Sequence, residues 1–196
     1  MARLPSHGAM ALLFISASFA GCAADEESRS GGDTALPPAY PDGPYGLEQD
    51  DVIGDLQLVN TDGETVALNT FHQGEAAALL LYVTATWCFT CGPEIDWLND
   101  YAPRVDGDLV AMSVLLQNKQ FEDATAADAL EFSEGYGAQF PTVLDPHGEL
   151  DVFREEAFIP LNLLVDTDSM RITLRETGFD EASLDGAIGS ILEKNK

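Results

Sequence analysis

Two cysteines separated by two residues, Cys88 and Cys91, form the clearest chemical motif in the chain. They follow an apolar, strand-like run that ends in Trp87, and a Gly-Pro-Glu sequence typical of a helix start comes directly after them. A strand that ends in Cys-x-x-Cys is the sequence pattern of a dithiol that forms and breaks a disulfide. Residues three apart in the first turn of a helix share one side, so we expect a Cys88–Cys91 disulfide.

The two cysteines are predicted to have different roles. Unpaired backbone N–H groups at a helix start favour a thiolate, which is the nucleophilic form of cysteine. Cys88 is therefore predicted to attack the partner, and Cys91 to resolve the mixed disulfide. Trp87 is expected to pack beside the sulfurs and limit access to them. Pro93 leaves two alternatives open, because either the regular helix begins there or the first turn is kinked.

The remaining cysteine and the histidines offer no second chemical site. The chain has three cysteines, and the third, Cys22, lies in the N-terminal segment, so none remains for a structural disulfide. A zinc site needs about four nitrogen or sulfur ligands. His72 and His147 are isolated in the sequence and no second Cys-x-x-Cys exists. We therefore predict no metal and no cofactor.

The first residues have the pattern of a targeting segment. Residues 1–21 contain Arg3 and then an apolar run, Ala9 to Ala20, which is too short to span a membrane and fits a signal peptide. Phe19 to Cys22 resembles a bacterial lipoprotein processing site, which implies a lipidated Cys22 and a membrane anchor without a transmembrane helix. The alternative is an ordinary signal peptide with a chance cysteine. Either indicates the bacterial cell envelope, facing the periplasm or the exterior.

The next segment and the overall charge restrict the partners. Residues 22–51 are rich in Gly, Pro, Ser and acids and are predicted to form a flexible tether, of which Tyr40 to Gly46 can lie against the domain. The formal net charge of -25 repels phosphate, so nucleic acid is not an expected partner. The charge indicates a solvated acidic surface or, alternatively, a face that steers a basic partner.

Residues 52–196 are predicted to form one α/β domain with a central mixed β-sheet flanked by helices. Residues 77–84 form a continuous apolar run, which is expected of a strand covered by helices on both faces. Alternation around Thr61 to Glu64 predicts an N-terminal β-hairpin. The other expected elements are helices at 93–102, 121–136 and 179–194, strands at 109–116, 140–145, 160–166 and 171–176, and a helical turn at 149–156.

Trp-Cys-x-x-Cys after a buried strand resembles the thioredoxin superfamily, and Glu94 completes the Cys-x-x-Cys-x-x-Glu pattern of its TlpA-type branch, which is redoxin or AhpC/TSA-like. The resemblance implies a thioredoxin-like fold with an added N-terminal hairpin. It also implies that Glu94 assists proton transfer at Cys91. The alternative is a plain acid that interacts with the helix dipole. Tyr82 stands where thioredoxin carries a buried acid, which favours the TlpA-type branch.

Pro160 resembles the cis-proline of the thioredoxin superfamily, because it opens an apolar strand that ends at Asp166. The resemblance implies that the Ile159–Pro160 peptide is cis and lies against the dithiol. The Ile159 backbone would then pair with an extended substrate chain. The alternative is an ordinary trans proline at the start of an edge strand.

These features predict a membrane-anchored, extracytoplasmic thiol-disulfide oxidoreductase that acts on protein thiols or disulfides. The resemblance implies electrons from a membrane partner and a role in cytochrome or copper-site maturation. One alternative is a peroxiredoxin-type peroxidase, whose pattern needs proline and threonine where Leu81 and Ala85 stand. Another is a copper-delivery or redox-inert binding module, which on this fold has a wider cysteine spacing and a distant histidine.

Overall fold

The computed structural model describes residues 39–195, so residues 1–21, Cys22 and residues 23–38 lie outside the described part. The described residues form one seven-stranded sheet in the order β2-β1-β5-β4-β3-β6-β7. The strands are β1 Gln57–Asn60, β2 Thr65–Ala67, β3 Ala78–Ala85, β4 Leu109–Gln117, β5 Thr142–Leu144, β6 Leu161–Asp166 and β7 Arg171–Thr177. The α-helices are α1 Gly92–Tyr101, α2 Ala126–Tyr136 and α3 Glu181–Lys194. Short 3₁₀ helices are η1 Leu68–Phe71, η2 Ala102–Val105, η3 Asp151–Phe153 and η4 Glu156–Phe158.

Strand β3 lies at the centre of the sheet, parallel to β4 and antiparallel to β6. All of its residues are buried, as its apolar sequence predicts. Its side chains alternate between two cores, with Leu81 on one face of the sheet and Leu80 and Tyr82 on the other. The well-packed strand positions the residues that follow its carboxyl end, which include both cysteines.

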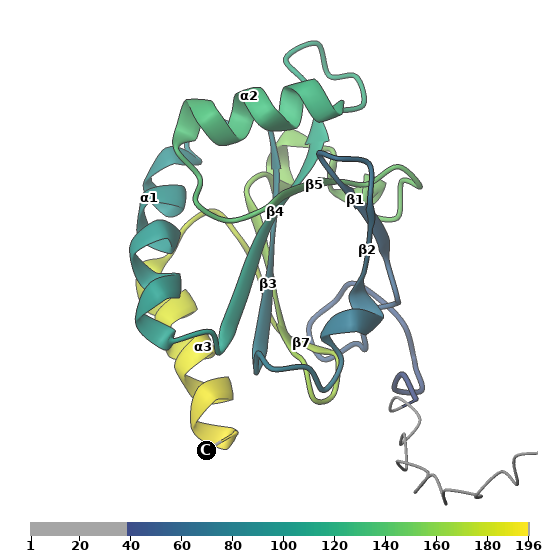
Figure 1. Ribbon diagram of the computed structural model, residues 1–196, viewed down its shortest axis with the longest axis vertical. Coiled ribbons are helices and arrows are strands. Elements are labelled where there is room, and N and C mark those ends of the chain that lie inside the picture. Colours follow the sequence, from purple (N-terminus) through teal and green to yellow (C-terminus); the bar gives the residue numbers. More distant parts are fainter. Residues whose placement is uncertain (1–38, 196) are drawn as a thin grey trace, which may run out of the picture. The chain divides into compact units, whose positions relative to one another are not determined.

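The three α-helices cover the same face of the sheet, where Ile95 of α1, Phe132 of α2 and Ile188 of α3 enter one core (Figure 1). The opposite face is covered by the N-terminal segment and by 3₁₀ turns, through residues such as Ile53 and Phe153. The prediction that helices cover both faces is therefore wrong for this second face. Its apolar residues come from short segments, which bury a strand without forming an α-helix.

The predicted hairpin is confirmed, with β1 and β2 antiparallel. The side-chain oxygen of Asn60 accepts hydrogen bonds from the backbone N–H groups of Asp62 and Glu64, which closes the turn. Gly63 has φ +83°, a left-handed conformation that glycine adopts without a steric cost. The other edge of β1 pairs with β5, so the hairpin extends the main sheet.

The described part of the predicted tether, residues 39–51, is packed on the domain. The Tyr40 hydroxyl donates to the Ile53 carbonyl at 2.8 Å, and its ring lies edge-on against the buried His72. The Asp50 N–H donates to the Ile172 carbonyl of β7 at 2.8 Å. Contact with the domain therefore begins before residue 52, since the Tyr40 hydroxyl bonds to Ile53 and the Tyr40 ring packs against His72. Among residues 39–195, no helix has the length and apolarity needed to cross a membrane.

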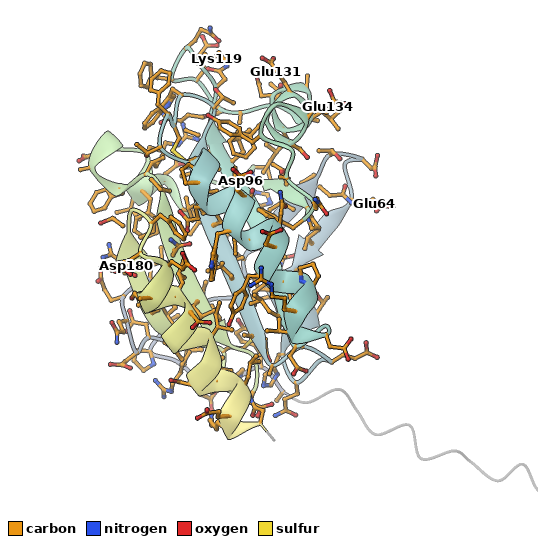
Figure 2. The ribbon with its side chains drawn as sticks, turned by 90° about the vertical axis from the view of Figure 1, so that its left-hand side faces the viewer. Glu64, Asp96, Lys119, Glu131, Glu134 and Asp180 are labelled. Atoms are coloured by element: carbon orange, nitrogen blue, oxygen red, sulfur yellow. A yellow bond between two sulfur atoms is a disulfide. The ribbon has the colours of Figure 1, made fainter. Side chains whose placement is uncertain are left out.

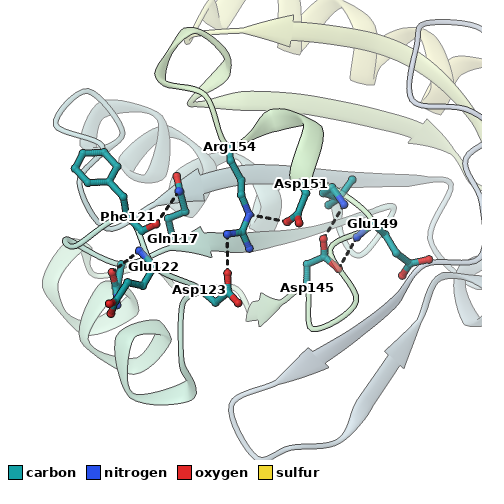
Figure 3. Close-up of polar contacts among 10 residues, drawn as sticks. Gln117, Phe121, Glu122, Asp123, Asp145, Glu149, Asp151 and Arg154 are labelled. Carbon is teal, nitrogen blue, oxygen red and sulfur yellow. Dashed lines mark hydrogen bonds and ion pairs between the residues drawn. The ribbon is translucent and has the colours of Figure 1, made fainter.

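Helix α2 begins five residues later than its composition predicts. Residues 118–125 form a loop in which Phe121 has φ +61°, so this residue is not helical. Figure 3 shows how the loop is held, with the Gln117 side chain donating to the Phe121 carbonyl at 3.2 Å and Arg154 paired with Asp123 at 2.6 Å. The helix starts only after Thr125, whose hydroxyl caps it.

Candidate active site

Cys88 and Cys91 lie directly after β3 and are joined by a disulfide, with a Cα–Cα distance of 5.6 Å. Cys88 keeps 3% of its surface exposed, whereas Cys91 is fully buried. The predicted pair is therefore present as a disulfide in the structure. A group that approaches from solvent reaches Cys88 more readily than Cys91, because only Cys88 keeps any exposed area.

The start of α1 differs from the sequence prediction. The helix begins at Gly92 with Cys91 as its N-cap, so neither cysteine lies in the first helical turn. Pro93 sits in that turn, where an N–H group would have no intrahelical partner. Cys88 lies in a preceding turn, and its N–H donates to the Ala85 carbonyl at 3.1 Å. The electrostatic effect of the α1 dipole falls off within one turn, so it acts more directly on Cys91 than on Cys88.

Polar groups from β3 and from the intervening residues contact the sulfurs. The Thr84 hydroxyl lies 3.2 Å from the Cys91 sulfur, and the Thr90 hydroxyl lies 3.8 Å from the Cys88 sulfur. A hydroxyl beside Cys91 can donate to the thiolate that forms when the disulfide opens. Thr84 was not among the predicted site residues, although a polar residue inside an apolar strand is a visible sequence signal.

Two tyrosines hold the backbone of the pair. The Tyr136 hydroxyl at the end of α2 donates to the Cys88 carbonyl at 2.8 Å, and the Tyr82 hydroxyl donates to the Cys91 carbonyl at 3.4 Å. Burial raises the pKa of Tyr82, and the nearby Glu94 raises it further. The Tyr136 contact joins residues 48 positions apart, so no local sequence pattern could reveal it.

Glu94 is fully buried in the first turn of α1. The Asn162 amide on β6 donates to its Oε1 at 2.6 Å, while its Oε2 has no partner among the described residues. Burial raises the pKa of Glu94 to about 8, the Asn162 hydrogen bond opposes this rise, and Glu176 adds to it. Glu94 is therefore mainly protonated at neutral pH, unlike a solvated acid at a helix start. Asn162 was not predicted as a site residue.

Three further predicted site residues are Ile159, Pro160 and Trp87. The Ile159–Pro160 peptide is cis, in agreement with the prediction. Ile159 packs against the buried cluster that contains both cysteines. Trp87 is half-buried, and its ring packs on Phe121 with centroids 5.4 Å apart. Within residues 39–195, no three His, Cys, Asp or Glu side chains are grouped as metal ligands.

The mixed sheet with three helices on one face, together with the disulfide at the end of β3, defines a thioredoxin-like thiol-disulfide oxidoreductase. The chain belongs to the AhpC/TSA family, whose sequence profile matches residues 50–170. No curated protein matches the chain.

Several solved structures share the fold. A candidate thiol:disulfide interchange protein DsbE from Chlorobium tepidum is 24% identical with a TM-score of 0.61, covering 75% of this chain and 99% of that one. A candidate protein disulfide isomerase from Bacteroides thetaiotaomicron is 22% identical with a TM-score of 0.61, covering 78% and 92%. An exposed lipoprotein thioredoxin from Streptococcus pneumoniae is 21% identical with a TM-score of 0.55, covering 71% and 99%.

Proposed function

We propose that the protein exchanges its Cys88–Cys91 disulfide with the thiols and disulfides of other proteins outside the cytoplasm. The observation that carries this proposal is a disulfide at the end of β3 in which Cys88 keeps a small exposed area and Cys91 is fully buried, with the buried carboxyl of Glu94 three residues further along the chain. The names of the Chlorobium and Bacteroides structures, an interchange protein and a disulfide isomerase, agree with this chemistry.

The exchange proceeds through a mixed disulfide. A substrate thiolate attacks the Cys88 sulfur, a substrate–Cys88 disulfide forms, and the Cys91 sulfur leaves with the electron pair of the broken bond. Glu94, protonated at neutral pH, supplies the proton for the leaving thiolate. A second thiol of the same substrate is deprotonated by solvent and attacks the substrate sulfur of the mixed disulfide. The substrate disulfide forms, and Cys88 leaves as a thiolate. The same steps in reverse reduce a substrate disulfide, so the partner sets the direction.

The envelope location and the lipid anchor at Cys22 are part of the proposal. Residues 1–22 lie outside the described residues, so the support comes from their sequence and from the likeness to an exposed lipoprotein thioredoxin. A membrane electron donor is proposed on the TlpA-type resemblance. Globomycin, which blocks lipoprotein signal cleavage, should cause the uncleaved precursor to accumulate, and Cys22→Ser should fail to incorporate labelled palmitate.

The structure favours disulfide exchange over the peroxidase alternative. Leu81 and Ala85, which occupy the positions of the peroxidase proline and threonine, are fully buried in β3. They offer no polar group to a peroxide. The copper-delivery alternative needs a further ligand beside the thiols, and an experiment can decide it directly.

Three assays on the full chain separate the functions. The proposal expects catalysed insulin reduction with dithiothreitol, loss of this activity in Cys88→Ser, and a stable mixed disulfide with substrate in Cys91→Ser. The peroxidase alternative expects hydrogen peroxide consumption with a thiol donor. The binding-module alternative expects one tightly bound Cu(I) per reduced chain without insulin reduction. Either of these last two results in place of insulin reduction would contradict the proposal.

The order of cysteine alkylation tests the roles within the pair. Cys88 of the reduced protein should react with iodoacetamide about tenfold faster than Cys91, because Cys91 is fully buried and a less accessible thiol reacts more slowly. Peptide mapping after short reaction times measures both rates. In denaturant the two rates should become similar, which serves as the control. Faster labelling of Cys91 in the native protein would reverse the assigned roles.

A further inference from the structure

A pocket of about 440 Å³ is lined by the segment that follows β3, by the loop that follows β4 and by helix α2. We call it the α2 pocket, and it is lined by Thr86, Phe89, Lys119, Gln120, Asp128, Glu131, Phe132, Gly135 and Tyr136. Phe89 stands between the two cysteines in the sequence, and Tyr136 donates its hydrogen bond to the Cys88 carbonyl. The lining of the pocket therefore includes the residue that follows Cys88 in the chain and the residue that donates to the Cys88 carbonyl.

Two aromatic rings at this end of the molecule are exposed to solvent. Phe89 is 94% exposed and Phe121 is 64% exposed, although burying a phenylalanine stabilises a protein by about 1.5–3 kcal/mol. Phe121 is also fixed in a left-handed conformation that bulky residues rarely adopt. The Asn118 side chain holds this loop by accepting hydrogen bonds from the N–H groups of Gln120 and Glu122. The loop thus presents the Phe121 ring to solvent, where it packs on Trp87.

The charge around the α2 pocket is negative. Asp128 and Glu131 line it, and its one lysine, Lys119, is already paired with Glu131 at 2.7 Å. Figure 2 shows Lys119, Glu131 and Glu134 at the same end of the molecule. Across residues 39–195, each lysine and arginine contacts a carboxylate or, for Arg171, the Asp50 carbonyl. Little positive charge is therefore left to attract an acidic partner.

We propose that the α2 pocket binds a segment of the substrate protein that carries an apolar side chain beside its reacting cysteine, flanked by lysine or arginine. This inference rests on the proposed function and names its substrate class. Phe89, which lines the pocket, and Phe121, which lies outside the lining on the loop that carries Lys119, supply the apolar contact. The acids supply charge complementarity, which raises the association rate. A second copy of the chain does not fit this description, because its own net charge is -25.

The rate of mixed-disulfide formation tests this proposal. The full chain with Cys22→Ser and Cys91→Ser retains Cys88 as its single thiol. The probes are tetrapeptides X-Phe-Cys-X, with X as Lys, Ser or Glu, each carrying thionitrobenzoate on its cysteine. The Cys88 thiolate attacks the peptide sulfur, a Cys88–peptide disulfide forms, and coloured thionitrobenzoate leaves with the bonding electron pair. The same leaving group on N-acetylcysteine amide measures the intrinsic reactivity of Cys88.

The Lys peptide should react at least about tenfold faster than the Glu peptide at low ionic strength, and added salt should reduce this difference. Phe89→Ala, Phe121→Ala and Glu131→Gln should each lower the ratio of the Lys-peptide rate to the small-probe rate several-fold. Val152→Ala removes an apolar group on η3 whose exposure is similar to that of Phe121, and Glu64→Gln removes an acid on the hairpin. Both should leave the ratio unchanged.

Equal rates for the three peptides, or a ratio unaffected by the pocket variants, would overturn the pocket proposal while leaving disulfide exchange in place. An unreactive Cys88 toward the small probe would instead contradict the proposed function itself. Urea unfolding of each variant shows whether a lowered ratio reflects a damaged fold. A variant that unfolds at the same urea concentration as the parent protein and has a lowered ratio supports the pocket.

Discussion

At the scale of single residues, the chemistry depends on groups with unequal exposure. Cys88 keeps a small exposed area, while Cys91 and Glu94 are fully buried. Asn162 holds one oxygen of Glu94 and leaves the other without a partner among the described residues. A buried carboxyl of this kind keeps its proton to a higher pH, which is the property that a proton donor at neutral pH requires.

The raised pKa of Glu94 also predicts how stability depends on pH. The folded-state pKa of about 8 lies above the ordinary value of 4.5, so folding takes up a proton between these values. The free energy of unfolding should therefore fall as the pH rises from about 4.5 to 8. Glu94→Gln should remove this fall, which amounts to about 1.4 kcal/mol for each unit of raised pKa.

Urea unfolding of the oxidised protein at pH 5 and pH 8 measures the effect. Glu94→Gln should be clearly more stable than the unsubstituted protein at pH 8 and similar to it at pH 5. Asp96→Asn removes an exposed acid from the same helix and serves as the matched control. Parallel pH curves for Glu94→Gln and the unsubstituted protein would show that Glu94 ionises as an ordinary surface acid.

At the scale of elements, the strongly patterned segments were predictable and the loops were not. The apolar run of β3, the hairpin turn and the cysteine motif each carry a local physical signal, and the structure contains all three. The start of α2 was missed because alanines and acids extend the helical composition back to residue 121. Asn162 and Tyr136 were missed because their partners lie 68 and 48 residues away in the chain.

The cap of α2 gives a prediction at this scale. Thr125 and Asp128 form a capping box, in which the Thr125 hydroxyl accepts from the Asp128 N–H and the Asp128 carboxylate accepts from the Thr125 N–H at 2.8 Å. Thr125→Ala should lower the free energy of unfolding by about 1 kcal/mol, since it leaves a backbone N–H of the first turn without its partner. Thr125→Ser should retain most of the stability. Equal losses in both variants, measured by urea unfolding, would show that the methyl group matters rather than the cap.

At the scale of the whole molecule, the dominant feature is negative charge. The chain carries 34 acidic and 9 basic residues, and its pI is about 4.1. Repulsion of this kind destabilises the compact state and is screened by salt. The same charge excludes acidic partners and favours basic ones, in line with the acids at the α2 pocket.

Salt should therefore stabilise the protein at neutral pH. Raising sodium chloride from about 20 mM to about 500 mM at pH 7 should raise Tm by several degrees, because screening weakens the repulsion among the carboxylates. Calorimetry measures the shift. Near pH 4.1 the same addition should have a much smaller effect, since the net charge is then close to zero. A Tm that falls with salt at pH 7 would mean that ion pairs outweigh the repulsion.

The central claim is that the Cys88–Cys91 disulfide is opened and closed as a working redox couple. The most direct test is its midpoint potential, obtained by equilibrating the protein in thiol–disulfide buffers and trapping free thiols. We predict a reversible two-electron transition between about -280 and -120 mV, the range of known exchange proteins. A pair that stays oxidised below about -300 mV, as structural disulfides do, or that fails to re-form after reduction, would contradict the account.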